Sequence, residues 1–114
     1  MMSGICMSQN IDGLKRALQK GKLFSPSLKT TTLLMVFEIL WNIGKDKSKC
    51  KQCFSKKTIR GLKQFKKLIR YFMKKSRRIE KRREKFMKTP SSFQKLIKRL
   101  IKEFLKNCCE EKGI

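Results

Sequence analysis

The sequence predicts a small all-α domain of about four helices, one of them long, basic and extending from the core. Apolar residues recur at intervals of three and four along much of the chain, which is the spacing of one helix face. Serines precede several of these stretches, as helix caps do. Both prolines, Pro26 and Pro90, lie at the boundary of such a stretch. The 114 residues suffice for one domain, expected to span residues 1–114.

The first helix is expected over about residues 9–20. Leu14 and Leu18 lie on its apolar face together with Ile11. Ser8 is the expected N-terminal cap, and Gly21 is expected to end the helix.

The second helix is expected over about residues 26–43, with Ser25 as its cap and Pro26 at its first position. Three threonines at 30–32 leave a short strand open as an alternative. The apolar stretch 28–43 has 16 residues and includes charged and polar ones, whereas a membrane span needs about 20. We therefore expect a core or interface helix and no membrane span.

The third helix is the long basic one and is expected over residues 56–88. Ser55 is its expected cap, and Pro90 ends it. Its apolar stripe is continuous only as far as Met73. Charged residues such as Arg82 interrupt the heptad pattern further on, so a sustained coiled coil is not expected.

The fourth helix is expected over residues 92–107, with Ser91 and Gln94 as a capping box. Lysines occupy one side, and the other side is apolar. We expect this side to pack on the second and third helices. The expected core residues are Phe37, Leu40, Trp41, Leu62, Phe65, Ile69, Ile97, Leu100 and Phe104.

The remaining segments are expected to contribute less to the fold. Residues 45–55 are rich in lysine and form a basic linker in this interpretation. Residues 1–7 and 108–114 are expected to be flexible ends.

The charge of the chain points to an anionic partner. The chain has 31 Lys and Arg against 8 Asp and Glu, for a net charge of +23, and no histidine. The lack of histidine excludes the usual serine and cysteine nucleophile pairs, and few carboxylates remain for acid–base chemistry. We therefore expect no enzyme. Nucleic acid, an anionic membrane surface or an acidic partner protein would each relieve the self-repulsion of such a charge.

Nucleic acid, with RNA favoured, is the partner that the charge distribution favours. Residues 45–88 hold 20 of the basic residues and only 3 acidic ones. A basic helix can lie along a phosphate backbone and release counterions, with little sequence specificity. We expect its basic side chains to lie outside the apolar stripe. The candidate nucleic-acid-binding residues are Lys67, Arg70, Lys74, Lys75, Arg77, Arg78, Lys81, Arg82, Arg83, Lys85 and Lys88.

The five cysteines give only weak signals. Cys50 and Cys53 have the spacing of zinc ligands, but an isolated pair is a weak metal site, so no cofactor is expected. Cys108 and Cys109 follow an amphipathic basic helix, a setting that also suits palmitoylation. The odd number of cysteines and the lack of a secretory signal favour mostly reduced thiols in an intracellular, non-secreted protein.

The second function considered is a membrane-active or partner-binding regulator that uses the 92–107 helix, which has a basic and an apolar side. The basic run of residues 74–88 also reads as a nuclear localisation signal, which favours the nucleus or nucleolus over the cytoplasm. In composition the chain resembles small basic accessory proteins of viruses. This resemblance assigns no role to any residue.

Overall fold

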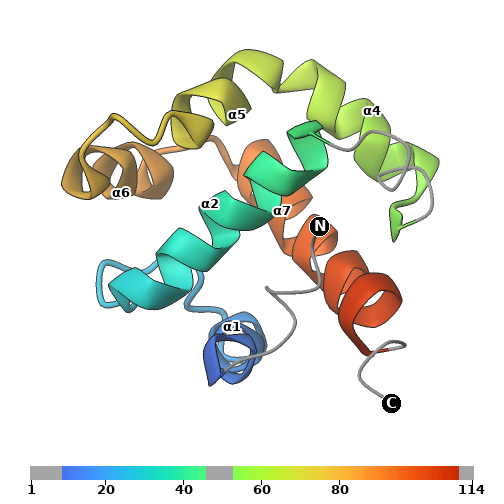
Figure 1. The fold of residues 1–114 in the computed structure, drawn as a ribbon, viewed down its shortest axis with the longest axis horizontal. Helices are drawn as coiled ribbons and strands as arrows, with labels where there is room; N and C mark the ends of the chain where they lie inside the picture. Colours follow the sequence, from blue (N-terminus) through green and yellow to red (C-terminus); the bar gives the residue numbers. More distant parts are fainter. Residues whose placement is uncertain (1–8, 46–52, 111–114) are drawn as a thin grey trace.

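The computed structural model describes residues 9–45 and 53–110, and within these ranges it is all-helical. Figure 1 shows α4 and α5 as an arch along one side of the molecule, with α2 and α7 crossing its middle. The predicted all-α class is confirmed, but the described residues form more helices than about four. The elements are α1 (Gln9–Gln19), α2 (Thr30–Lys45), α4 (Lys56–Gln64), α5 (Lys66–Met73), α6 (Ile79–Met87), α7 (Ser91–Phe104) and the π-helical segment η1 (Leu105–Glu110).

A cluster of phenylalanine rings joins four of the helices. The ring of Phe72 from α5 lies 5.3 Å from Phe37 of α2, 5.4 Å from Phe86 of α6 and 5.9 Å from Phe93 of α7, measured between centroids. All four side chains are at most 3% exposed. Aromatic contacts at these distances add to the hydrophobic stabilisation of the burial itself.

The predicted core is confirmed for most of its members. Phe37, Leu40, Ile69, Ile97, Leu100 and Phe104 are buried, whereas Trp41, Leu62 and Phe65 are half-buried. The apolar side of α7 is entirely within the core, which confirms its expected packing inside the domain.

The long helix expected over residues 56–88 is not observed, because the chain bends twice. The first bend is at Phe65, whose φ of −104° and ψ of 30° separate α4 from α5. The second is the five-residue turn between α5 and α6, in which no residue is apolar. A straight helix would carry Phe86 about 21 Å beyond Phe72. The turn instead brings the two rings together, and burial of both side chains stabilises this arrangement.

One predicted helix start and two predicted N-caps are also wrong. Ser25 accepts a hydrogen bond from the backbone N–H of Ser27 at 3.2 Å, which makes a local turn, and α2 begins only at Thr30. Helix α7 has Pro90 at its N-cap instead of Ser91, and Gln94 Nε2 donates to the carbonyl oxygen of Thr89 at 3.2 Å.

Other boundaries agree with the sequence. The hydroxyl of Ser55 caps α4 by accepting a hydrogen bond from Thr58 N–H. Gly21, with a φ of 66°, ends α1 in the left-handed conformation that glycine adopts readily. The proposed cap Ser8, the end segment 1–7 and most of the 45–55 linker lie outside the described residues.

Candidate nucleic-acid interface

The outer face of α4 and α5 carries a row of basic side chains. They recur at intervals of four and three residues, which places one cation on each helical turn, about 5.4 Å apart. All are exposed, and they lie opposite the buried side of the same helices, which includes Ile69 and Phe72. We call this row the α4–α5 ridge; it consists of Lys56, Arg60, Lys63, Lys67, Arg70 and Lys74.

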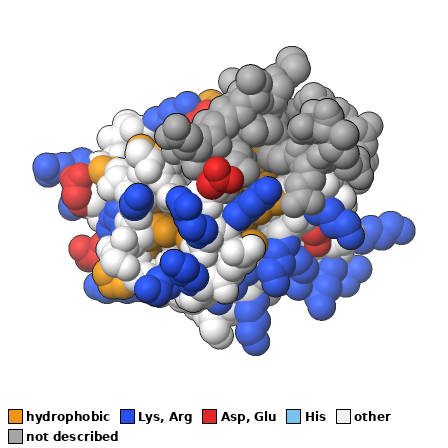
Figure 2. Space-filling view, turned by 90° about the horizontal axis from the view of Figure 1, so that it is seen from below, with side chains coloured by type: hydrophobic (Ala, Val, Ile, Leu, Met, Phe, Trp, Pro, Cys, Tyr) orange, Lys and Arg blue, Asp and Glu red, His pale blue; other side chains and the backbone are white. Residues whose placement is uncertain are grey.

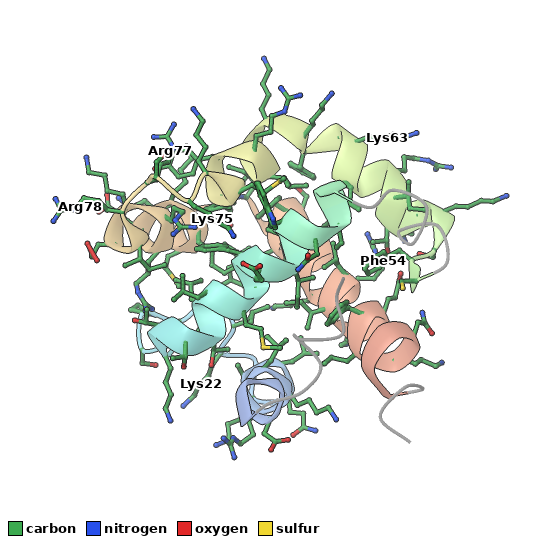
Figure 3. The ribbon with its side chains drawn as sticks, in the orientation of Figure 1. Lys22, Phe54, Lys63, Lys75, Arg77 and Arg78 are labelled. Carbon is green, nitrogen blue, oxygen red and sulfur yellow. The ribbon has the colours of Figure 1, made fainter. Side chains whose placement is uncertain are left out.

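The ridge has no acidic neighbours along the chain. Residues 47–79 contain neither Asp nor Glu. Within the described part of the chain, no ridge residue is in an ion pair; the pairs found nearby are Lys75–Glu38 at 3.7 Å, Arg78–Glu80 at 3.8 Å and Lys88–Glu84 at 3.5 Å. Figure 3 shows the side chain of Lys63 pointing away from the body of the molecule. The ridge therefore concentrates positive charge on one exposed strip.

A carboxylate of α7 holds the start of the ridge in place. Glu103 accepts hydrogen bonds from the Ser55 N–H at 2.8 Å, the Ser55 hydroxyl at 3.1 Å and the Thr58 hydroxyl at 2.9 Å. Arg99 of α7 also donates to the Thr58 hydroxyl oxygen, at 3.3 Å. A negative charge at the first turn of a helix is favourable because the backbone N–H groups there are unpaired. Glu103 thus joins α4 to α7.

Helix α6 uses two of its arginines inside the fold. Arg82 is only 7% exposed, lies 5.1 Å above the Phe37 ring and donates from Nη1 to the carbonyl oxygen of Phe72 at 3.2 Å. Arg83 donates to the carbonyl oxygen of Leu28 at 2.7 Å and to the hydroxyl of Thr30 at 2.9 Å. The expectation that basic side chains lie outside the apolar stripe is therefore wrong for Arg82, whereas Arg83 is half-buried. Their guanidinium groups already bind protein oxygens.

The turn between α5 and α6 forms a smaller basic cluster around Tyr71. The Arg77 guanidinium lies 4.3 Å and the Lys85 ammonium 5.6 Å from the centre of this ring. Figure 3 shows Arg77 and Arg78 pointing outward, whereas Lys75 points toward α2. Tyr71 is half-buried.

The predicted site residues therefore separate into groups. Lys67, Arg70, Lys74 and Arg77 are exposed and continuous with the ridge or the turn. Lys75, Arg78 and Lys88 are exposed but paired with a carboxylate, and Lys81 and Lys85 lie on the exposed part of α6. The candidate list did not include the ridge residues Lys56, Arg60 and Lys63. Their alternating spacing of four and three residues and the absence of acidic residues in 47–79 are the sequence signals for them.

The face that carries α1 has a more mixed surface. Figure 2 shows the face that carries α1, where Lys and Arg side chains are interspersed with apolar patches and acidic groups.

Most of the cysteine predictions concern side chains outside the described residues. Cys53 is the one cysteine whose side chain the structure describes; it is 8% exposed and disulfide-bonded, in contrast to the expected reduced thiol. In the described residues, no group of three or more metal-ligating side chains comes together. Cys50 and the side chains of Cys108 and Cys109 lie outside the description.

Among the described helices, none is both long and apolar enough to cross a membrane. In comparisons with known proteins, no protein family, curated protein or solved structure matches this chain.

Proposed function

We propose that this protein binds nucleic acid, with RNA favoured, by placing the phosphate backbone along the α4–α5 ridge and the adjoining turn. The observation that carries the proposal is the row of six exposed cations, from Lys56 to Lys74, none of which pairs with a carboxylate in the described part of the chain. Cations that are free of carboxylates are available to replace the counterions of a polyanion.

The geometry of the ridge suits a repeating anion. Within each of α4 and α5, successive ridge cations lie one helical turn apart, a rise of about 5.4 Å. Lysine contacts phosphate as a point charge, and arginine adds two-pronged hydrogen bonding. Phosphate contacts carry no direct sequence information, so the proposed binding has little sequence specificity.

The membrane and partner-protein alternatives have less support. The amphipathic 92–107 segment was the reason to consider them, and its apolar side chains from Phe93 to Phe104 are in the core. An insertion of this helix into lipid would require the domain to open. The ridge itself lacks the apolar flank that membrane-surface helices insert.

The salt dependence of binding tests the proposal. We expect the affinity for a single-stranded RNA of 12 nucleotides to fall with a log–log salt slope of about −4, if all six ridge cations contact phosphates. Replacing Arg60, Lys63, Lys67 and Arg70 by Gln should flatten the slope by about 3 units. Fluorescence anisotropy of labelled RNA measures both quantities.

A matched control variant shows whether binding depends on the ridge or on the net charge of the protein. Replacing Arg16, Lys20, Lys22 and Lys29 by Gln removes the same number of charges from exposed positions in and after α1, on the side of the molecule opposite α4 and α5 (Figure 1). This control should keep most of the slope. An equal loss of slope in both variants would show that binding depends on the total charge of the protein and not on the ridge. Binding to anionic vesicles but not to RNA would reverse the choice of partner.

A nuclear or nucleolar location is part of the same proposal. Exposed Lys and Arg in the ridge and the turn are accessible for import or for retention on RNA. A fluorescent fusion of the full chain should concentrate in the nucleus, and the ridge variant should do so less. The same distribution for both variants would assign retention to other residues. The compositional likeness to viral accessory proteins remains an expectation of the same kind.

A further inference from the structure

An open pocket lies where the ridge meets the turn between α5 and α6. Its volume is about 360 Å³, and it is lined by Trp41, Arg70, Met73, Lys74, Lys75 and Ser76. Two of these residues, Arg70 and Lys74, also belong to the ridge. Phosphates bound along the ridge would therefore pass directly over the mouth of the pocket.

The lining combines an aromatic ring and an apolar side chain with three cations. Trp41 and Met73 are half-buried, while Arg70, Lys74 and Lys75 are exposed. This arrangement fits a flat, largely apolar group that is attached to an anion. Ligand pockets usually start at about 300 Å³, so the volume suits one small group rather than an extended one.

We propose that this pocket receives one unpaired base of the single strand whose phosphates lie on the ridge. The proposal rests on the proposed function and adds the strandedness of the ligand. A row of cations alone can bind either a duplex or a single strand. Only a single strand has unpaired bases that can leave their stack and lie on an aromatic side chain. The indole of Trp41 offers such a surface.

Lys75 occupies part of this surface in the free protein. Its ammonium lies 4.9 Å from the centre of the Trp41 ring and 3.7 Å from the Glu38 carboxylate. The Lys75 side chain is 61% exposed, so its movement costs little packing. A base that displaces it would keep a π-face on the indole and bring a phosphate within reach of the released ammonium.

The fluorescence of Trp41 reports on the pocket directly, because it is the only tryptophan in the chain. We expect a 12-nucleotide single-stranded RNA to change the emission. An abasic strand of the same length, an RNA duplex and inorganic polyphosphate should bind without changing it. Anisotropy or calorimetry records binding in each case. An equal change of emission with the abasic strand would overturn the proposal.

Two variants that change different lining residues test the pocket. Trp41→Leu should weaken RNA binding roughly tenfold, the size of one lost stacking contact, and leave abasic binding unchanged. Ser76→Phe fills the pocket from an exposed position and should have the same effect in a folded protein. Circular dichroism checks the fold of both.

The outcomes distinguish the two proposals. If no polyanion binds, the proposed function fails and the pocket proposal with it. If RNA, the abasic strand and the duplex bind equally well and Ser76→Phe changes nothing, the ridge binds phosphate and the pocket proposal alone is wrong. Selective loss of base-containing strands in both variants would support the pocket.

Discussion

Helix α6 and the α4–α5 ridge are both rich in lysine and arginine, yet the two regions use these side chains differently. In α6, Arg82 and Arg83 donate to protein oxygens, and Lys88 pairs with Glu84. In the ridge, every cation is exposed and none pairs with a carboxylate in the described residues. All cations of the ridge are therefore accessible, whereas in α6 only some are, such as Lys81 and Lys85.

The local density of charge in the sequence therefore does not show which cations are exposed and unpaired in the fold. The 74–88 run is the densest part of the sequence, but it contains Glu80 and Glu84 and has few apolar residues to hold its helix in place. In this run arginine side chains contribute to packing, because their long apolar stems can be buried. In the ridge helices the buried side includes Ile69 and Phe72 of α5, and the arginines Arg60 and Arg70 are exposed.

The largest expected effect tests the structural role of α6. Arg82→Ala should lower the free energy of unfolding by about 3 kcal/mol, because it removes a charged hydrogen bond and a contact with the Phe37 ring. Chemical denaturation measures the change. Arg60→Ala on the ridge should stay within about 0.5 kcal/mol of the parent.

Arg82→Met refines this test. Methionine can fill the space of the stem, and it removes the buried Nε–H, which has no hydrogen-bond partner among the described residues. We expect a loss of about 1 kcal/mol, clearly smaller than for alanine. If the Arg82→Ala variant were as stable as the parent protein, α6 would present this arginine to solvent, and the contrast between the two regions would disappear.

Much of the fold could be predicted from the sequence, because it depends on local patterns. Caps and 3–4 spacing identified the α4 start at Ser55 and the buried side of α7. The bend after Met73 could not be predicted in this way. The phenylalanines at 65, 72 and 86 keep a heptad spacing, so the pattern fits a straight helix as well as a bent one. The choice depends on ring contacts between α2, α5 and α6.

The candidate site shows the same division. The existence of a basic surface followed from composition, but its position did not. Arg82 lies three residues after Ile79 and four before Phe86, so it shares their helix face, and this spacing indicates its burial. The role of Glu103 depends on α7 reaching the start of α4, a contact between residues 45 and 48 positions apart.

The second prediction concerns what holds the ridge in place. Glu103→Ala should lower the free energy of unfolding by about 2 kcal/mol, since three hydrogen bonds to the first turn of α4 are lost. Glu103→Gln keeps one acceptor oxygen and should cost about half as much. Hydrogen exchange should accelerate more in α4 than in α6. Equal acceleration in both helices would show that Glu103 supports the whole core and has no special relation to the ridge.

The smallest expected effect distinguishes the two regions by charge reversal. Arg60 lies on α4 with Lys56, Lys57 and Lys63 three or four residues away and no acid in the helix. Arg60→Glu replaces three repulsions by three attractions and should stabilise the protein by about 1 kcal/mol. Lys81→Glu on α6 gains Arg78 and Lys85 as neighbours but also faces Glu84, so its gain should be smaller. Thermal unfolding measures both gains.

RNA affinity should fall more for Arg60→Glu, because a surface selected for binding keeps a repulsion that the fold does not need. If Lys81→Glu stabilised the protein as much and weakened RNA binding as much as Arg60→Glu, the two regions would be electrostatically equivalent, and the ridge would have no separate function.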